Sequence, residues 1–329
     1  MDVQRALAFG KPRYVRFQPG RRLVVLYDSL AHLTVLRPRA TERLWQEVAG
    51  SPLASRVPEL GGVLQRFPLD ARLPGLATAI ECGELVRYKP GRRAVIRYRG
   101  AYGKLRADRR APVALPGTPP VLEHRPELGL AVYKEMPGTP LRDSDLEAWM
   151  APVADAMARL HATPADLPPH SMDAELADLR AAAEVAAALG FECGALTDRL
   201  CAGLAAVEPR RATIHGSFHD DQVLVGPGGV TLLDLDSAAI GHPLLDVGHF
   251  ASYLSAAGED AARAAFLDAC RAPRDALLFE AAALLRWSSL PFRDLEPGWP
   301  DAMARRIALA GERLADYERR SASSVITAS

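Results

Sequence analysis

Residues 214–249, IHGSFHDDQVLVGPGGVTLLDLDSAAIGHPLLDVGH, form the most informative stretch of this chain. They read as a short strand, a polar loop and two further strands, at 223–225 and 230–233, joined by a Pro-Gly-Gly turn. Polar residues crowd both ends of this hairpin: His215, Ser217, His219, Asp220, Asp221 and Gln222 before it, Asp234 and Asp236 after it. Because a hairpin brings its ends together, we expect a loop amide and two carboxylates to converge on one small volume. Such oxygen ligands suit a hard cation such as Mg²⁺, with phosphate oxygens completing its shell. The alternative is an ordinary hairpin with a solvated loop.

A repeat lies closer to the N-terminus. Residues 14–27, YVRFQPGRRLVVLY, recur at 85–98 as LVRYKPGRRAVIRY, with the whole Pro-Gly-Arg-Arg turn retained. Each copy predicts a β-hairpin in which Gly20 or Gly91 supplies the positive φ that the turn requires. Between the copies, residues 40–48 predict a short helix capped by Thr41. We therefore expect two hairpins of similar build, a cap module followed by a β-rich lobe.

The second copy is strongly basic. Between residues 85 and 110, Asp108 is the only acid among many arginines and lysines. A positive hairpin suits polyphosphate or RNA, whereas the plainer interpretation is a solvated arginine-rich face. Lysine is rare in this chain, so Lys104, at the end of the predicted strand AYGK, is informative. As a point charge it could contact phosphate oxygens.

Strands are expected before residue 138 and helices after it. Two short strands are predicted within residues 113–132, and an apolar strand at 130–134 leads to a Pro-Gly turn. Ser144 and Glu147 have the spacing of a capping box that opens a helix ending near His161. Further helices are predicted at 173–189, 196–207, 246–257, 260–270, 274–290 and 300–320.

Composition narrows the class of protein. The 329 residues carry no formal net charge, so the chain lacks an overall basic footprint for nucleic acid. The four cysteines show no CxxC spacing and read as buried thiols of a reducing compartment. No basic n-region follows Met1, and no apolar run reaches the roughly 18 residues that span a membrane. These features predict a soluble cytoplasmic protein, and they leave its oligomeric state open.

Four features in chain order resemble the aminoglycoside phosphotransferase and choline kinase-like family. They are the strand lysine Lys104, the strand and Pro-Gly hinge at 135–138, a helix ending in Leu160-His161, and the loop HGSFHDDQVLV followed by LLDLDSAAIGHPLLDVG. The family pattern is HGDxHxxNxL, then a strand ending in aspartate, then GDPxxDLA, and maltokinase-like members carry glutamine where Gln222 stands.

The resemblance implies an α+β, bilobal, protein-kinase-like fold and an ATP-dependent small-molecule kinase. We expect a cap-like module at 1–75, a β-rich nucleotide-binding lobe at 76–138 and a helical catalytic lobe at 139–329. The substrate would be a hydroxylated small molecule such as an aminoglycoside, a sugar or a related metabolite.

The resemblance also assigns roles to residues. It makes Gln222 and Asp234 the Mg²⁺ ligands and has His215 and Asp246 brace the loop. The cofactor-binding candidates, which would contact the phosphates or the adenine of ATP, are Lys104, Arg92, Arg93, Glu135 and Met136.

The chain departs from the family at the catalytic base. Ser217 occupies the position of the aspartate that accepts the hydroxyl proton, and a serine cannot act as a base near neutral pH. Losing that base typically lowers the rate by a factor of about 10²–10⁴. Possible substitutes nearby in sequence are Asp220, Asp221 and Asp236. Two smaller departures are a connection after Lys104 too short for a helix, and His242 where the family has aspartate.

Three hypotheses follow from these patterns. The first is an active kinase with a displaced carboxylate as base. The second is a pseudokinase that binds ATP and Mg²⁺ without efficient catalysis. The third, a nucleic-acid-binding protein using the basic face at residues 85–110, is disfavoured by the zero net charge and the lack of interleaved aromatic residues.

Overall fold

The structure is a computed structural model that describes residues 2–326, with side chains to residue 321. Its internal contacts divide the chain into two compact units. Unit 1 consists of Met1–Pro112, Pro120–Glu135 and Leu290–Trp299, and unit 2 of Val113–Pro119, Met136–Ser289 and Pro300–Ser329. Unit 1 is mostly strand and unit 2 mostly helix, so the predicted α+β class is confirmed.

Unit 1 begins with a five-stranded antiparallel sheet. Its strands are β1 (Pro12–Gln18), β2 (Arg22–Tyr27), β3 (His32–Leu36), β4 (Ala54–Val57) and β5 (Gly62–Gln65), in the order β1-β2-β3-β5-β4. The short helix α1 (Val3–Ala8) precedes this sheet, and α2 (Pro38–Val48) connects β3 to β4. Leu44 and Val48 of α2 are buried against Val63 of β5, which fixes the helix on the sheet.

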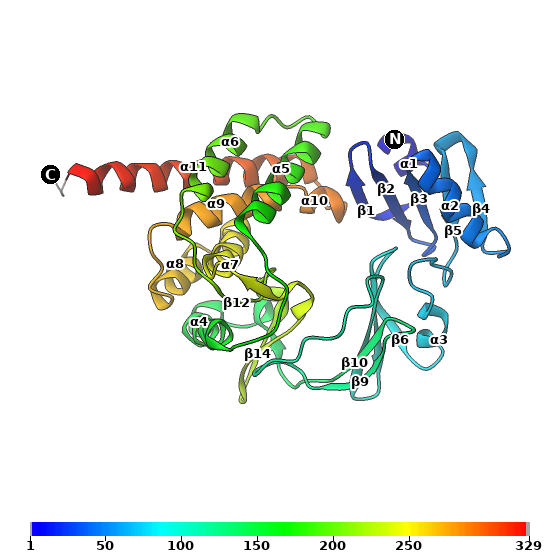
Figure 1. Cartoon of the computed structure of the whole chain (residues 1–329), viewed down its shortest axis with the longest axis horizontal. Coiled ribbons are helices and arrows are strands. Elements are labelled where there is room, and N and C mark those ends of the chain that lie inside the picture. The colour runs from blue at the N-terminus through cyan, green and yellow to red at the C-terminus, as the bar shows by residue number, and fades with distance from the viewer. Residues whose placement is uncertain (1, 327–329) are drawn as a thin grey trace. The chain divides into compact units, whose positions relative to one another are not determined.

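A second sheet in unit 1 repeats this strand order. It contains β6 (Glu84–Lys89), β7 (Arg93–Tyr98), β8 (Ala101–Arg106), β9 (Val121–Arg125) and β10 (Leu130–Lys134), ordered β6-β7-β8-β10-β9. The repeat seen in the sequence as two hairpins therefore extends to two whole sheets, drawn in blue and cyan in Figure 1. The copies differ where α2 stands, because no helix joins β8 to β9 in the described chain. The short helices α3 (Leu76–Ile80) and α10 (Leu290–Arg293) complete the unit.

The two sheets share a core and a buried polar network. Tyr14 of β1 packs in one apolar cluster with Leu105 of β8. The buried Asp70 carboxylate accepts from the Tyr88 hydroxyl at 2.9 Å, and that hydroxyl lies 3.1 Å from Nδ1 of His32 on β3. Burial lowers the pKa of His32, so the ring is neutral and its Nδ1–H donates to Tyr88. The network ties the first sheet to the second without a buried cation.

Unit 2 is built from helices that the sequence pattern predicted within a few residues. They are α4 (Leu146–Ala162), α5 (Met172–Ala188), α6 (Gly194–Ala205), α7 (Leu244–Ala257), α8 (Asp260–Ala269), α9 (Ala276–Arg286) and α11 (Trp299–Ile326). Helix α9 is buried along almost its whole length. It approaches α7 so closely that a Cβ on Gly248 would lie 2.5 Å from a backbone carbon of Phe279. In the part of the chain described, no helix is both long and apolar enough to cross a membrane.

Short strands in unit 2 carry the polar loop. The hairpin strands are β13 (Val223–Gly226) and β14 (Gly229–Leu232), close to the predicted positions, and β11 (Thr139–Pro140) pairs with β13. A separate ladder pairs β12 (Ala212–Ile214) with β15 (Ala239–Gly241). The loop therefore starts at the end of one ladder and enters the next.

Four local predictions were wrong. Helix α2 starts at Pro38, and the Thr41 hydroxyl bonds to the Leu36 backbone instead of capping the helix. Asp145, not Ser144, caps α4. Residues 113–119 form no strand, since prolines there remove backbone donors. The four cysteines are free, but Cys82 is exposed.

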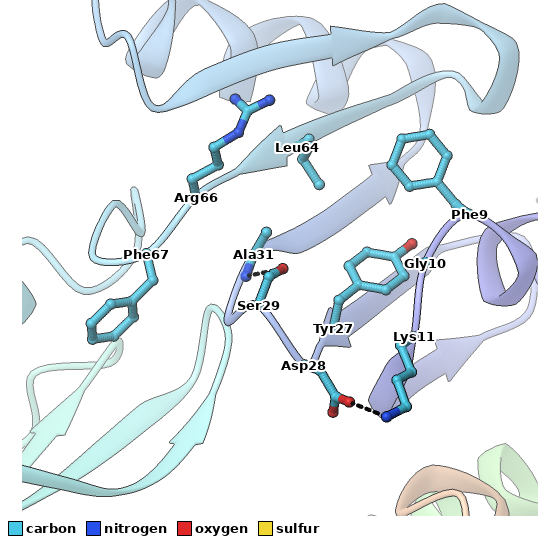
Figure 2. A pocket seen from close by; sticks show the side chains of 10 residues that line it. All are labelled: Phe9, Gly10, Lys11, Tyr27, Asp28, Ser29, Ala31, Leu64, Arg66 and Phe67. Atoms are coloured by element: carbon cyan, nitrogen blue, oxygen red, sulfur yellow. Dashed lines mark hydrogen bonds and ion pairs between the residues drawn. The ribbon is translucent and has the colours of Figure 1, made fainter.

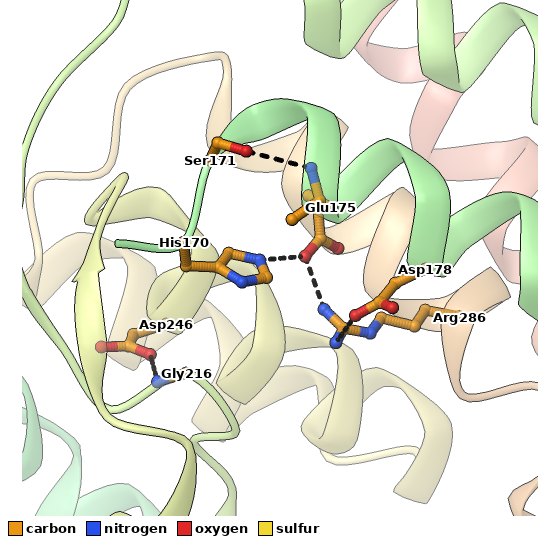
Figure 3. Close-up of polar contacts among 8 residues, drawn as sticks. His170, Ser171, Glu175, Asp178, Gly216, Asp246 and Arg286 are labelled. Carbon is orange, nitrogen blue, oxygen red and sulfur yellow. Dashed lines mark hydrogen bonds and ion pairs between the residues drawn. The ribbon is translucent and has the colours of Figure 1, made fainter. Parts of the chain in front are cut away.

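A buried ionic network supports α5 and α9 of unit 2 (Figure 3). Glu175, which is 1% exposed, accepts from Nε2 of His170 at 3.0 Å and from Arg286 at 2.5 Å. Arg286 also bonds to Asp178 at 2.6 Å. Burial opposes ionisation of Glu175, but the His170 hydrogen bond and the Arg286 charge outweigh it and lower its pKa to about 2. The charge is thus compensated inside the helical core.

Candidate functional site

The loop between β12 and β13 is held by a buried carboxylate. Asp246, in the first turn of α7, is fully buried and accepts from the N–H of His215 at 2.7 Å and of Gly216 at 2.9 Å. Figure 3 shows the contact with Gly216. Nε2 of His161, near the end of α4, lies 2.9 Å from the same carboxylate. Burial alone would raise the pKa of Asp246, but these donors and the charge on His161 outweigh it and lower the pKa.

His215 orients the next segment through its ring. Nε2 lies 2.8 Å from the carbonyl oxygen of Leu233, and because a carbonyl only accepts, Nε2 carries the proton. Burial lowers the pKa of His215, which keeps the ring neutral. The ring also contacts the fully buried Phe218, with centroids 5.4 Å apart. The loop is thereby fixed on both sides of Ser217.

Gln222 and Asp234 come together at the open end of the hairpin. The N–H of Leu233 donates to the carbonyl of Gln222 at 2.8 Å, which places Asp234 next to Gln222. Asp234 has φ 61° and ψ 52°, the left-handed region that non-glycine residues rarely adopt. A backbone held there costs about 1–3 kcal/mol and is typical of functional sites.

The side chain of Gln222 is a candidate ligand for a cation. The amide oxygen of Gln222 is buried and has no hydrogen-bond partner among the described residues, so it remains available as a ligand. An amide oxygen beside a carboxylate is a donor set for Mg²⁺. Neither here nor elsewhere among the described residues does a group of three or more His, Cys, Asp or Glu residues lie together so that it could hold a metal ion.

Arg142 forms ion pairs with two of the three candidate bases. Its guanidinium lies 3.4 Å from the Asp220 carboxylate and forms an ion pair with Asp221. Burial opposes ionisation of Asp220, but the His219 hydrogen bond and the Arg142 charge lower its pKa. An acid whose pKa is lowered is a weaker base. The third candidate, Asp236, lies in the short 3₁₀-helix Leu235–Ser237 after the hairpin.

Sequence reasoning missed Arg142, which is 78 residues before Asp220. It also missed Tyr253 of α7, whose ring stacks on His219 with centroids 4.4 Å apart. Neither residue lies near the loop in sequence, and no spacing pattern joins them to it. His161 was noted as part of the helix end, but its contact with Asp246 was not anticipated.

His242 retains a structural role at the family's aspartate position. Its Nδ1 accepts from the N–H of Leu244 at 3.2 Å, so the imidazole caps a backbone donor in the first turn of α7. Burial lowers the pKa of His242, which keeps that nitrogen free to accept. The ring also stacks on Phe279 with centroids 4.8 Å apart.

The remaining predicted residues lie mainly on the second sheet of unit 1. Leu105, opposite Ala94, faces the core, so Lys104 projects from the other face of the sheet. Arg93, opposite Arg106, shares the face of Lys104. The side chain of Glu135 bonds to Arg97 at 3.1 Å. The predicted cofactor residues Lys104, Arg92, Arg93 and Glu135 belong to unit 1, and Met136 belongs to unit 2.

The first sheet also bears a cavity of about 510 Å³ (Figure 2). Its lining includes Phe9, Tyr27 and Phe67, with the ion pair of Lys11 and Asp28 at 3.2 Å. None of the predicted site residues lines it.

Solved structures of small-molecule kinases share this fold. A choline/ethanolamine kinase family protein from Mesorhizobium loti matches with a TM-score of 0.53 and 17% identity, over 75% of this chain and 97% of its own. A choline kinase from Streptococcus pneumoniae gives 0.51 and 12%, over 71% and 95%. A thermostable aminoglycoside phosphotransferase mutant, in a ternary complex with AMP-PNP and hygromycin B, gives 0.52 and 16%, over 70% and 93%. At these identities the likeness shows the fold, which is protein-kinase-like as predicted.

The family follows from the sequence match. The model of the phosphotransferase enzyme family matches residues 86–287, more than half of the chain. The chain therefore belongs to this family. The match includes the second sheet, the polar loop and the hairpin, whereas the first sheet lies outside it. No curated protein sequence matches the chain.

Proposed function

We propose that this phosphotransferase moves the γ-phosphate of ATP to a hydroxyl group of a small molecule, with Gln222 and Asp234 holding Mg²⁺. The observation that carries the proposal is the buried amide oxygen of Gln222, which lacks a partner among the described residues. The main-chain carbonyl of the same residue accepts from the N–H of Leu233, the residue before Asp234. Leaving the buried amide oxygen unsatisfied costs about 1–3 kcal/mol, and coordination of a cation would offset that cost. The neighbour that binds AMP-PNP and hygromycin B supports a nucleotide and a hydroxylated acceptor as ligands.

The chain's own residues would position the reactants. Lys104 and Arg93 project from one face of the second sheet, and we assign both to the ATP phosphates; Arg92 lies in the same turn as Arg93. The backbone at Glu135 and Met136 is assigned to the adenine. Mg²⁺, when bound, would neutralise charge on the phosphate oxygens. The acceptor oxygen then bonds to the γ-phosphorus as the bond to the bridging oxygen breaks, ADP leaves, and the hydroxyl proton passes to a carboxylate.

We propose Asp236 as that carboxylate. Ser217 cannot take the proton, and Arg142 pairs with both Asp220 and Asp221. Asp236 follows Asp234 by two residues and lies in the 3₁₀ turn Leu235–Ser237, of which Asp234 is the N-cap. Removing a general base typically lowers the rate by about 10²–10⁴-fold, so this assignment is measurable.

A pseudokinase is the second candidate, and Ser217 is the observation that favours it. The loop is held by hydrogen bonds to Asp246 and from His215, yet Ser217 stands where the family has its base. A protein of this kind would bind ATP and Mg²⁺ and regulate a partner. The two candidates agree on nucleotide binding and differ only in turnover.

Nucleotide binding is tested by the melting temperature with ATP and Mg²⁺. A ligand present at about 100 times its dissociation constant adds about 2.7 kcal/mol of stability, which is easily detected. The Asp234→Ala variant should lose this stabilisation, whereas Asp155→Ala, an exposed acid on α4, should keep it. No Mg²⁺-dependent shift in the native protein would overturn the proposed function.

Turnover separates the candidates. ADP release is measured with a panel of aminoglycosides and sugars as acceptors. Activity that disappears in Asp236→Asn but survives in Ser217→Ala supports the relocated base. Activity that appears only in Ser217→Asp identifies a pseudokinase.

A further inference from the structure

Four arginines gather at one end of the core shared by the two sheets of unit 1. Two come from the hairpin of the first repeat, one from the connection to α3 and one from the turn of the second repeat. We call this group the arginine cluster; it consists of Arg16, Arg22, Arg72 and Arg92.

Strand register places the first pair together. Gln18 of β1 is opposite Arg22 of β2, and Arg16 is opposite Val24. Arg16 and Arg22 therefore lie diagonally across the hairpin on one face, a spacing of about 7–8 Å between Cα atoms that long side chains span. Both are half-buried.

Asp70 places the second pair together. Its carboxylate accepts from the N–H of Arg72 at 2.9 Å and of Gly91 at 2.7 Å, which fixes the two backbones side by side. Cγ of Arg72 would lie 3.9 Å from a Cβ on Gly91, and Arg92 is the next residue in the turn. Arg72 and Arg92 are exposed.

The two pairs meet across the sheets. Tyr14, two residues before Arg16, has Nζ of Lys89 5.7 Å above its ring, so β1 runs next to the start of the second turn. Burial and the charges of Arg92 and Arg22 lower the pKa of Arg16 to about 10. Burial and the charges of Arg72 and Arg92 likewise lower the pKa of Arg22. The four guanidinium groups thus repel one another, and burial of two of them weakens the screening by water.

Carboxylates do not relieve this repulsion. Within the side chains described, none of the four guanidinium groups forms an ion pair with Asp or Glu. The carboxylate of Asp70 already accepts from two backbone N–H groups and from the Tyr88 hydroxyl. Four guanidinium groups therefore share one neighbouring carboxylate, that of Asp70, and an excess of positive charge remains on unit 1.

We propose that the arginine cluster binds a small anion carrying two or more phosphate groups. Guanidinium groups match phosphate oxygens with paired hydrogen bonds, and several of them exceed the charge of about −2 on a single phosphate. The cluster is small, with two half-buried arginines (Arg16, Arg22) next to two exposed ones (Arg72, Arg92). This arrangement suits a compact anion better than the backbone of a nucleic acid, which needs an extended row of basic residues. Lys104 projects from the face of its sheet away from the shared core, so this site is separate from the lysine assigned to ATP. Arg92 is the one member of the cluster that is also a candidate for the ATP phosphates.

Calorimetric titration with tripolyphosphate and pyrophosphate, without Mg²⁺ and at constant ionic strength, tests the proposal. We expect saturable binding that weakens at least tenfold in Arg16→Gln/Arg22→Gln. The same double variant should melt at an equal or higher temperature without ligand, because the repulsion is reduced. That combination distinguishes a ligand site from residues needed only for folding. Metal-free ATP in a parallel titration tells whether nucleotides are an alternative source of the phosphates.

The matched control is Arg21→Gln/Arg39→Gln, which removes two exposed arginines, one from the turn between β1 and β2 and one from α2. It should bind tripolyphosphate as the native protein does. Equal weakening in the control, or no saturable binding, overturns the proposal. So does tighter, salt-sensitive binding of an RNA oligonucleotide, which would make the cluster a nucleic-acid surface. Asp234→Ala should bind tripolyphosphate normally; loss of binding there would locate the anion at the metal site instead.

Discussion

Replacing Asp246 by asparagine should weaken the hydrogen bonds that hold the loop of the candidate site and destabilise the protein. The carboxylate is fully buried; Oδ2 accepts from the N–H of His215 at 2.7 Å and lies 2.9 Å from His161, and Oδ1 accepts from Gly216 at 2.9 Å. Asparagine keeps the shape but has one acceptor oxygen. Its NH₂ group must therefore face at least one of these donors, and the charge that strengthens all three contacts is lost.

The structure sets the size of the effect. Hydrogen bonds to a charged group contribute about 1.5–3 kcal/mol each, and an unsatisfied buried donor costs about 1–3 kcal/mol. We expect Asp246→Asn to lower the free energy of unfolding by about 3–5 kcal/mol. At about 2–4 °C per kcal/mol for a protein of this size class, the melting temperature should fall by roughly 10 °C.

The sign of the pH dependence follows from the lowered pKa of Asp246, whose burial is outweighed by its donors. An unfolded aspartate titrates near pH 3.9, so the stabilisation is fully present above about pH 5. It is lost as the pH falls through the lower folded-state pKa. The contribution of the Asp246 carboxylate to the difference between native protein and variant should thus be present above about pH 5 and shrink in stronger acid.

Scanning calorimetry at several pH values measures both quantities. Asp155→Asn is the control, because this exposed aspartate lies on α4, the helix that bears His161, and surface changes usually stay within about 0.5 kcal/mol. A loss below about 1 kcal/mol in Asp246→Asn would refute the reasoning, since it would mean that the donors find other partners.

Three further outcomes are expected. Gly216→Ala should abolish Mg²⁺-dependent ATP stabilisation, because φ is 77° and the new Cβ would lie 2.2 Å from a backbone oxygen; thermal shift with and without ATP measures this. Tyr88→Phe should cost about 1–3 kcal/mol, because Asp70 loses the buried hydroxyl that links the two sheets; chemical denaturation measures this. Iodoacetamide at pH 8 should label the exposed Cys82 well before Cys270, since burial raises the pKa of Cys270 to about 12; mass spectrometry follows the order.

Each of these has an informative control. Gly228→Ala changes a hairpin glycine with open space around it and no positive φ, so ATP stabilisation should survive. Tyr102→Phe removes a hydroxyl from a long, 3.4 Å contact with Glu135 and should cost less than the change at Tyr88. Equal effects within either pair, or early labelling of Cys270, would contradict the packing described.

Local signals accounted for much of the fold and for the hairpin that carries the candidate site. Helical spacing located the helices of unit 2, and the Pro-Gly-Gly turn located β13 and β14. Because a hairpin's ends meet whatever surrounds them, the sequence alone predicted that Gln222 and Asp234 would be neighbours. The duplicated Pro-Gly-Arg-Arg turn likewise predicted a repeat of two hairpins, but it did not predict that each repeat is a sheet of five strands.

Only the tertiary structure decided which charges meet. Arg142 pairs with Asp220 across 78 residues, and His161 reaches Asp246 across 85, so no local period connects them. Strand β1, with Arg16, and the turn that holds Arg92 are neighbours because two sheets share one core, a packing that strand patterns do not encode. Turn chemistry and periodicity act between residues close in the chain, whereas ion pairs depend on how separate elements pack. That is why the polar loop could be recognised from its residues, but the partners of its acids could not.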